Sequence, residues 1–325
     1  MRAIVVERLG GPEVLTVGDL VVPAPGPGQV SIDVAYAGVN FAEVKQRSTG
    51  YLLKSLPFQP GLEVSGWVRA VGAGVTGLAP GQEVAALTGS GGYAEVAIAD
   101  AATVFAVPAG LSLRTAATLP TVLPTAHALL HETGRLRAGE SVLVQAAAGG
   151  VGTVVGQLAR LAGAGAVYGV VSRPDKVEHA RASGYDEVFV GDDFADGVRR
   201  ATGGRGVDLA LDPVGDDAFR RSLAALAPFG RLVAFGNASG APAWQVGLTD
   251  LWPGRSVTGF SVLTLARTAP ELLRPLATKA FALVADGSVR LPISAEYPLA
   301  EAAEAHRRIE SRTTTGKLVL RVTGN

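Results

Sequence analysis

The chain has 325 residues, of which 48% are hydrophobic and 18% are charged, and this balance excludes a chain that is disordered overall. Basic and acidic residues number 29 each, so the protein lacks the net positive field of a general nucleic-acid binder. Cysteine is absent, which excludes disulfides, thiolate nucleophiles and cysteine-ligated zinc. The length predicts two domains.

Two stretches are candidates for a targeting or membrane segment. The start of the sequence, MRAIVVERLGG, has an apolar run that is too short for a signal-peptide core. The longest uncharged run near the middle, residues 141–159, holds four glycines and two glutamines, which suits a buried strand and helix better than a membrane span. We therefore expect a soluble, cytoplasmic protein without a membrane partner.

The first third of the chain is rich in β-prone runs. Each run has about 4–8 such residues and is bounded by glycine or proline, as in an antiparallel barrel or sandwich. These runs lie at residues 3–6, 30–35, 61–75, 81–87, 91–99 and 103–110. A turn-rich connection, PAPGPGQV, separates the first two.

The pattern changes near residue 112. Ser112 is a candidate N-cap for an alanine-rich helix, and residues 125–132 predict another helix. Beyond them, strands alternate with helices, which predicts a parallel sheet that is covered on both faces. We expect strands at 141–146, 166–171, 187–190, 207–212 and 231–236, and helices at 152–161, 176–182 and 216–226. The chain ends with a predicted helix at 301–309 and a strand at 317–322.

The segment AAAGGVG, residues 146–152, carries the strongest functional signal. Ala147, Gly149 and Gly152 occupy the three positions of a G-x-G-x-x-G fingerprint, directly after a buried strand and at the start of a helix. Small residues let backbone N–H groups approach a pyrophosphate and let the helix begin close to the strand. We expect the dinucleotide pyrophosphate to bind at Ala148, Gly149, Gly150, Val151 and Gly152. The alternative is a plain glycine-rich turn.

The end of the second strand of this region indicates which dinucleotide binds. An NAD site usually places an acidic residue there, but this sequence has Ser172, followed by Arg173 and Lys176. A hydroxyl and two cations suit a 2′-phosphate, so NADPH is the predicted cofactor. The alternative is that both cations are solvated charges at the start of a helix.

These motifs resemble the quinone oxidoreductases, the zinc-independent branch of the medium-chain dehydrogenase/reductase superfamily. AAAGGVG, GRGVD (204–208) and RLVAFGNASG (231–240) carry the resemblance, together with GVNFAEVKQR (38–47) and ESRTTTGKLVL (310–320). It covers essentially the whole chain. It implies an α/β protein: a β-rich, GroES-like catalytic domain at 1–118 and 262–325, and an inserted Rossmann domain with a doubly wound parallel sheet at 119–261. The active site is expected in the cleft between them.

The resemblance also implies site residues. Asn40 and Tyr51 are the expected catalytic residues, and Asn40 also lies near the nicotinamide. Further cofactor contacts are expected at Thr125, Gly236, Asn237, Phe260, Ser261 and Lys317. The sequence departs from the family at Glu43, where an aspartate is usual, and at Lys45 and Gly191, where some relatives have aromatic residues. Without the resemblance, Asn40 reads equally well as a turn residue that caps its own backbone, and Tyr51 as a packed loop aromatic.

No metal is expected. Zinc-dependent relatives use a Cys and a Gly-His-Glu motif, but here the triplet is Gly61-Leu62-Glu63, and leucine cannot ligate a metal. His127 and His131 have helical i, i+4 spacing and no plausible third ligand nearby, so we interpret them as ordinary helix residues.

The predicted activity is NADPH-dependent hydride transfer to a small quinone. The alternative is an enoyl or 2-alkenal reductase, with carrier-bound or CoA thioesters among its candidate substrates and with Arg47 and Lys54 as candidate contributors to a cationic mouth. A third reading is a non-catalytic NADPH-binding protein. The resemblance further implies a homodimer that is joined through its Rossmann sheets, and the uncharged run SVTGFSV (256–262) is the candidate edge.

Overall fold

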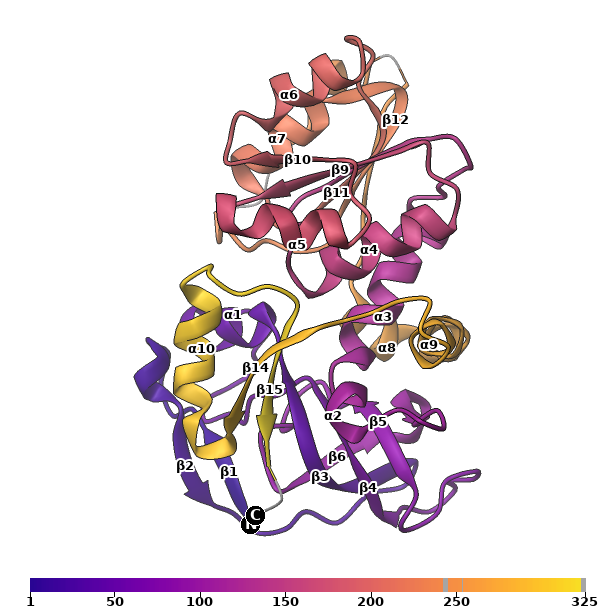
Figure 1. The fold of residues 1–325 in the computed structure, drawn as a ribbon. Coiled ribbons are helices and arrows are strands. Elements are labelled where there is room, and N and C mark those ends of the chain that lie inside the picture. Colours follow the sequence, from indigo (N-terminus) through magenta and orange to yellow (C-terminus); the bar gives the residue numbers. More distant parts are fainter. Residues whose placement is uncertain (242–244, 253, 323–325) are drawn as a thin grey trace. The chain divides into compact units, whose positions relative to one another are not determined.

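The computed structural model describes residues 1–241, 245–252 and 254–322 (Figure 1). These residues form two compact units. Unit 1 comprises residues 1–124 and the C-terminal part from Val262 onward, and unit 2 comprises Thr125–Ser261. The first division falls inside helix α3 (Leu119–Ala128), directly after Pro124, and lies a few residues beyond the expected boundary at 118/119. Pro124 lacks the N–H that would continue the helical hydrogen bonds.

Unit 1 is built on a mostly antiparallel sheet in the order β14-β15-β3-β4-β5-β7, with β6 pairing β3. Among the described strand pairs of this sheet, only β14–β15 is parallel. A separate two-stranded ladder joins β1 to β2. The strands are β1 (Arg2–Val5), β2 (Thr16–Asp19), β3 (Gln29–Val39), β4 (Glu63–Val71), β5 (Glu83–Leu87), β6 (Val96–Asp100), β7 (Val104–Ala106), β14 (Ile293–Pro298) and β15 (Lys317–Arg321). The predicted β-rich N-terminal third is confirmed.

The core of unit 1 collects the inward side chains of these strands. Ile4, Ile32, Val64 and Leu320 are fully buried members of this cluster, which also includes the aromatic ring of Tyr93. Burial of such apolar side chains contributes about 25 cal/mol for each Å² removed from water. The helices of this unit are α1 (Phe41–Thr49), α2 (Leu113–Ala116), α8 (Val262–Thr268), α9 (Pro270–Ala285) and α10 (Ala302–Glu310), with the first part of α3.

Unit 2 is a six-stranded parallel sheet in the order β10-β9-β8-β11-β12-β13. Counted along the chain within this unit, that order is 3-2-1-4-5-6, which is the Rossmann arrangement. The strands are β8 (Ser141–Val144), β9 (Ala166–Val171), β10 (Glu187–Val190), β11 (Val207–Asp212), β12 (Leu226–Ala234) and β13 (Ser256–Gly259). The predicted parallel sheet is therefore confirmed.

Helices connect the strands of unit 2 and cover its sheet (Figure 1). Helix α4 (Gly150–Leu161) packs against β8 and β9, and α7 (Asp216–Ala224) packs against β11 and β12. The other helices are α5 (Val177–Ala182) and α6 (Phe194–Ala201), and a π-helical turn (Leu129–Thr133) follows α3. The strands are short and nearly continuous in apolar residues because both faces of the sheet are covered.

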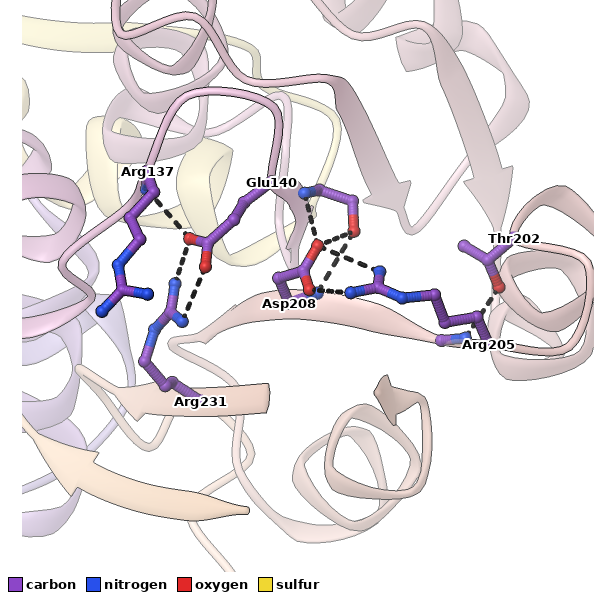
Figure 2. A network of polar contacts seen from close by, with 8 residues as sticks. Arg137, Glu140, Thr202, Arg205, Asp208 and Arg231 are labelled. Carbon is purple, nitrogen blue, oxygen red and sulfur yellow. Dashed lines mark hydrogen bonds and ion pairs between the residues drawn. The ribbon is translucent and has the colours of Figure 1, made fainter. Parts of the chain in front are cut away.

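A polar network ties together the amino-terminal ends of the strands in unit 2 (Figure 2). Glu140 accepts two hydrogen bonds from the Arg231 guanidinium, which also donates to the carbonyl of Gly134 at 2.7 Å. Asp208 accepts from the backbone N–H and the hydroxyl of Ser141, both at 2.9 Å, and pairs with Arg205. This network stabilises the edge of the sheet that lies opposite the carboxyl ends of the strands.

Several local predictions need correction. The run at 256–262 is not one strand, because β13 ends at Gly259 and helix α8 begins at Val262. The structure also has helices that the sequence patterns do not predict, namely α1, α6, α8 and α9. The sequence of α1, FAEVKQRST, is largely polar and shows no strong apolar period. Gly50 ends this helix in the left-handed conformation, at φ 74°. Within the described ranges, no helix is both long and apolar enough to span a membrane.

Candidate functional site

The turn after β8 leaves a row of backbone N–H groups without capping side chains. Helix α4 starts at Gly150, and its N-cap residue, Gly149, has no side chain to cap it. The first N–H groups of a helix have no partner within the helix and point along its positive dipole end. Ala148 is buried and Val151 is half-buried beside this turn. The donor set at 150–152 therefore fits an anion such as a pyrophosphate.

Gly152 explains why the turn requires small residues. A Cβ atom added at Gly152 would lie 2.4 Å from the carbonyl oxygen of Ala146 and 2.7 Å from the Cα of Ala147. The helix can therefore begin this close to the strand only with glycine at this position. The carbonyl of Gly152 accepts a 2.6 Å hydrogen bond from the buried Tyr185 hydroxyl. Tyr185 lies 33 residues further along the chain, and no local signal in the sequence indicates its role.

The three residues predicted to bind a 2′-phosphate lie together at the carboxyl end of β9. Ser172 and Arg173 are exposed, and Lys176 is half-buried in the short 3₁₀ turn Pro174–Lys176. The guanidinium of Arg173 already pairs with the carboxylate of Asp175, through contacts of 2.9–3.2 Å. Asp175 therefore partly neutralises the positive charge of Arg173. A bound phosphate has to displace the Asp175 carboxylate from this guanidinium.

A histidine links the two segments of unit 2 that are predicted to bind phosphate groups of the cofactor. The Nε2 atom of His179, on α5, lies 2.8 Å from the Thr153 hydroxyl in the first turn of α4. Burial, followed by the positive charge of Lys176, lowers the pKa of His179. The imidazole is therefore favoured in its neutral form, which can accept or donate one hydrogen bond to Thr153.

The predicted nicotinamide-side loop of unit 2 follows β12. The Asn237 amide donates to the carbonyl of Ala241 at 2.9 Å and accepts from the Ser239 hydroxyl at 2.9 Å, so this side chain organises its own loop. A Cβ atom at Gly236 would lie 2.8 Å from the carbonyl oxygen of Pro213. Phe260 donates its N–H to the carbonyl of Ala234, which places it and Ser261 directly beyond β13. Thr125 is buried in helix α3.

In unit 1, Asn40 is the N-cap residue of α1 and forms a capping box with Glu43, so part of its role is to begin this helix. The amide nitrogen also donates to carboxylate oxygens of Glu43 (3.3 Å) and Glu63 (3.0 Å), and the amide oxygen accepts from Lys317 (2.6 Å). Glu43 in turn accepts the backbone N–H of Asn40 and that of Leu62.

Glu43 and Glu63 are both fully buried, and Lys317 is 4% exposed. Burial raises the pKa of Glu43 to about 7, against the opposing effect of the Lys317 charge. Lys317 pairs with Glu63 at 2.7 Å and also donates to the carbonyl of Val39 at 3.0 Å. Lys317 is a predicted cofactor contact, and the hydrogen bonds that it makes to Val39, Asn40 and Glu63 all lie within unit 1.

The other predicted substrate-side residues have different surroundings. Tyr51 is 42% exposed in the turn after α1. Lys54 is exposed on the same loop. The expectation that Arg47 contributes to a cationic mouth is wrong, because its side chain is fully buried. Its guanidinium donates to the carbonyl of Gly10 and pairs with Glu310 on α10.

The structure also tests whether the residues present fit a catalytic zinc. Leu62 is fully buried, and its backbone N–H is bound by Glu43. The rings of His127 and His131 lie 4.5 Å apart between centroids. No group of three or more His, Cys, Asp or Glu side chains suited to a metal occurs in the described part of the chain. This donor set does not fit zinc.

Comparison with known proteins gives two matching families. The alcohol dehydrogenase GroES-like domain matches residues 26–109, and the zinc-binding dehydrogenase family matches residues 183–320. A quinone oxidoreductase of Pseudomonas aeruginosa is 38% identical over 316 residues, which is 96% of each chain. A 2-haloacrylate reductase of a Burkholderia species is 33% identical over 98% of each chain. The solved structure of the Escherichia coli quinone oxidoreductase complexed with NADPH matches with a TM-score of 0.93 at 31% identity, covering 99% of this chain and 100% of that one.

Proposed function

Since the chain belongs to the zinc-independent quinone oxidoreductase family of the medium-chain dehydrogenase/reductase superfamily, we propose that it is an NADPH-dependent enzyme that reduces a small quinone. The observation that carries this proposal is the uncapped first turn of α4 at the carboxyl edge of a Rossmann sheet. When bound, NADPH supplies the hydride. The net reaction consumes NADPH, a proton and the quinone, and gives NADP⁺ and the hydroquinone.

The cofactor is held by two segments of unit 2 in this proposal. The N–H groups of 150–152 bind the pyrophosphate, and Ser172, Arg173 and Lys176 bind the 2′-phosphate. The Ser172 hydroxyl and the two cations favour NADPH over NADH, because an acidic residue would be required for the free ribose hydroxyl of NADH. The contact between Thr153 on α4 and His179 on α5 holds together the two helices that follow these segments.

Quinone reduction requires little chemistry from the protein side chains. The enzyme has to position the acceptor and shield it, and the quinol oxygens can take protons from water. Of the residues predicted to act on the substrate, Tyr51 is exposed, and a tyrosine hydroxyl can donate to a quinone oxygen. Leu62 and the absence of a fitting donor set in the described residues lead us to derive no step through zinc.

A second candidate function is the reduction of an activated alkene, such as an enone, 2-alkenal or enoyl thioester. The relative that is named 2-haloacrylate reductase favours it, since a haloacrylate is an alkene conjugated to a carboxylate. In this reaction the hydride goes to the β-carbon, and a proton follows to the α-carbon or the oxygen. The buried position of Arg47 removes one of the two cations that favoured a carrier-bound substrate.

The experiment that separates these functions measures NADPH oxidation with four acceptors: 1,4-benzoquinone, 9,10-phenanthrenequinone, a 2-alkenal and crotonyl thioester. We expect the two quinones to have the higher kcat/KM. A higher kcat/KM with the alkenal or thioester would make the second function the correct one. NADPH binding without oxidation by any acceptor would support a non-catalytic protein.

We also propose that two copies assemble through unit 2. Strand β13 is the last strand of the parallel sheet, so its outer edge is not paired within the described chain. Its residues, Ser256–Gly259, are uncharged, and an exposed uncharged edge favours pairing with another strand. Light scattering at micromolar concentration is expected to give the mass of a homodimer, and the mass of a monomer would contradict this assembly.

A further inference from the structure

Tyr185 is a buried tyrosine of unit 2 that contacts the first turn of α4 from the segment between α5 and β10. It is 4% exposed, and its hydroxyl lies 2.6 Å from the carbonyl oxygen of Gly152. A carbonyl can only accept, so the hydroxyl donates. Burial raises the pKa of Tyr185, which keeps the hydroxyl protonated as a donor. A neutral, buried hydrogen bond therefore holds the turn that we expect to bind the pyrophosphate.

This hydrogen bond is additional to the regular bonds of the helix. In an α-helix the carbonyl of residue 152 accepts the N–H of residue 156, which uses one of its two lone pairs. The Tyr185 hydroxyl uses the second. Because the planar peptide units of one helical turn are linked, fixing this carbonyl also limits how far the N–H groups of 150–152 can turn.

The aromatic ring of Tyr185 fills the space between α4 and β9. A Cβ atom added at Gly156 on α4 would lie 2.6 Å from Cε2 of the ring, and one added at Gly169 on β9 would lie 2.9 Å from Cδ1. Glycine at both positions lets the helix and the strand close on the ring. The ring therefore sets the separation between α4, which carries the pyrophosphate turn, and β9, which leads to Ser172.

The backbone on either side of Tyr185 is anchored to the same two elements. Arg160, in the last turn of α4, donates from Nε to the carbonyl of Gly184 at 2.8 Å and pairs with Asp186. Asp186 accepts the N–H of Val167 on β9 with its carboxylate and donates its own N–H to the Val167 carbonyl, both at 2.8 Å. Tyr185 thus reaches the first turn of α4 from a fixed backbone position.

We propose that Tyr185 is a positioning residue for the cofactor, which holds the first turn of α4 so that the N–H groups of 150–152 are directed at the pyrophosphate. This inference rests on the proposed function. Tyr185 is not a catalytic residue, because its hydroxyl is buried and donates to Gly152. Its effect belongs to the part of the cofactor that NADPH and NADH share, and it does not extend to the 2′-phosphate.

The test uses Tyr185→Phe, which keeps the ring and removes the hydroxyl. Calorimetry measures binding of three ligands: NADPH, ADP-ribose, which has the pyrophosphate without the 2′-phosphate, and 2′-AMP, which has the 2′-phosphate without the pyrophosphate. We expect Tyr185→Phe to bind NADPH and ADP-ribose roughly two- to tenfold more weakly than wild type, as for the loss of one neutral hydrogen bond. It should bind 2′-AMP as tightly as wild type does.

Tyr168→Phe is the matched control. Tyr168 precedes Gly169 on β9 and therefore points to the opposite face of the sheet from Tyr185, where its ring lies 6.2 Å from that of Phe189 between centroids. Its replacement should leave all three affinities unchanged. In steady-state oxidation of NADPH by 1,4-benzoquinone, Tyr185→Phe should raise the KM for NADPH and keep the wild-type kcat at saturating cofactor. Thermal unfolding shows that each variant is folded at the assay temperature.

Two results would overturn the inference. The first is a folded Tyr185→Phe variant that binds ADP-ribose as tightly as wild type. The second is an equal loss of affinity for ADP-ribose and 2′-AMP, because the hydroxyl would then support unit 2 as a whole and not the pyrophosphate turn. The wild-type protein tests the proposed function separately. Absence of NADPH binding to wild type would refute that function, whereas tight binding by both wild type and variant refutes only the role of Tyr185.

Discussion

Replacing Glu43 by glutamine is expected to remove a pH dependence from the stability of unit 1. Burial raises the pKa of Glu43 from 4.5 to about 7 in the folded protein. Between these values the unfolded chain ionises this carboxyl while the folded protein keeps it protonated. A raised folded pKa gives stability that is fully present below about pH 4.5 and is lost as the pH rises through about 7.

The size of the effect follows from the shift. Each pKa unit corresponds to about 1.4 kcal/mol, so ionising Glu43 inside the fold costs about 3 kcal/mol. For a unit of this size that is a fall in Tm of roughly 6–12 °C between pH 5 and pH 8. Glu43→Gln should be less stable than wild type at pH 5, because the N–H groups that Glu43 now accepts lose an acceptor. Its Tm should change much less with pH.

Thermal unfolding of wild type and of Glu43→Gln is followed by circular dichroism at intervals from pH 5 to pH 8. It measures how the Tm of each protein changes with pH. Other titrating groups contribute to each curve equally, so the difference between the two proteins isolates Glu43. Glu304→Gln is the matched control, because that glutamate is exposed on α10 and its replacement should leave the wild-type slope in place. If Glu43→Gln and wild type lose stability in parallel over this range, Glu43 is ionised throughout and the burial argument is wrong.

Three further predictions concern unit 2. Asp175→Asn should tighten NADPH binding by roughly two- to fivefold and leave NADH binding nearly unchanged, since it releases Arg173 for the 2′-phosphate. Calorimetry measures both affinities, and an equal change for the two cofactors would contradict the prediction. Gly152→Val should abolish NADPH binding by displacing the first turn of α4, and unchanged binding would show that the turn tolerates a side chain. Arg231→Met should destabilise unit 2 by about 1–3 kcal/mol in urea unfolding, because it leaves Glu140 without its ion-pair partner, and the preference among electron acceptors should not change. An unchanged free energy of unfolding would mean that the network in Figure 2 contributes little to stability.

The parts of this protein that could be predicted from sequence are those in which the signal is local. The turn at 146–152 was recognisable because the close approach of helix and strand excludes a side chain at Gly152. Ser112 was recognisable as an N-cap, and its hydroxyl does accept the Thr115 N–H at 3.2 Å. The alternation of strands and helices predicted the parallel sheet, because each βαβ unit repeats the same local pattern.

What could not be predicted depends on pairing between distant segments. Asn40, Glu63 and Lys317 meet because β15 lies beside β3, and nothing near residue 40 indicates that Lys317 will be its neighbour. Arg47 was misjudged for a related reason. A charged residue is usually exposed, but here the two terminal nitrogens of the guanidinium donate to the Gly10 carbonyl and to Glu310 inside the fold. Asp175 lies close to Arg173 in the sequence. Only the structure shows that its carboxylate pairs with the Arg173 guanidinium and so competes with a phosphate.

The proposed activity is tested most directly by a single anaerobic turnover. Excess protein, treated with a chelator, is mixed with NADPH and 9,10-phenanthrenequinone, and both NADPH and hydroquinone are quantified. We expect one hydroquinone to form for each NADPH consumed, and we expect no turnover with Gly152→Val. Persistence of NADPH with every acceptor tested, or its oxidation without formation of a reduced product, would contradict the assignment of this protein as an NADPH-dependent reductase.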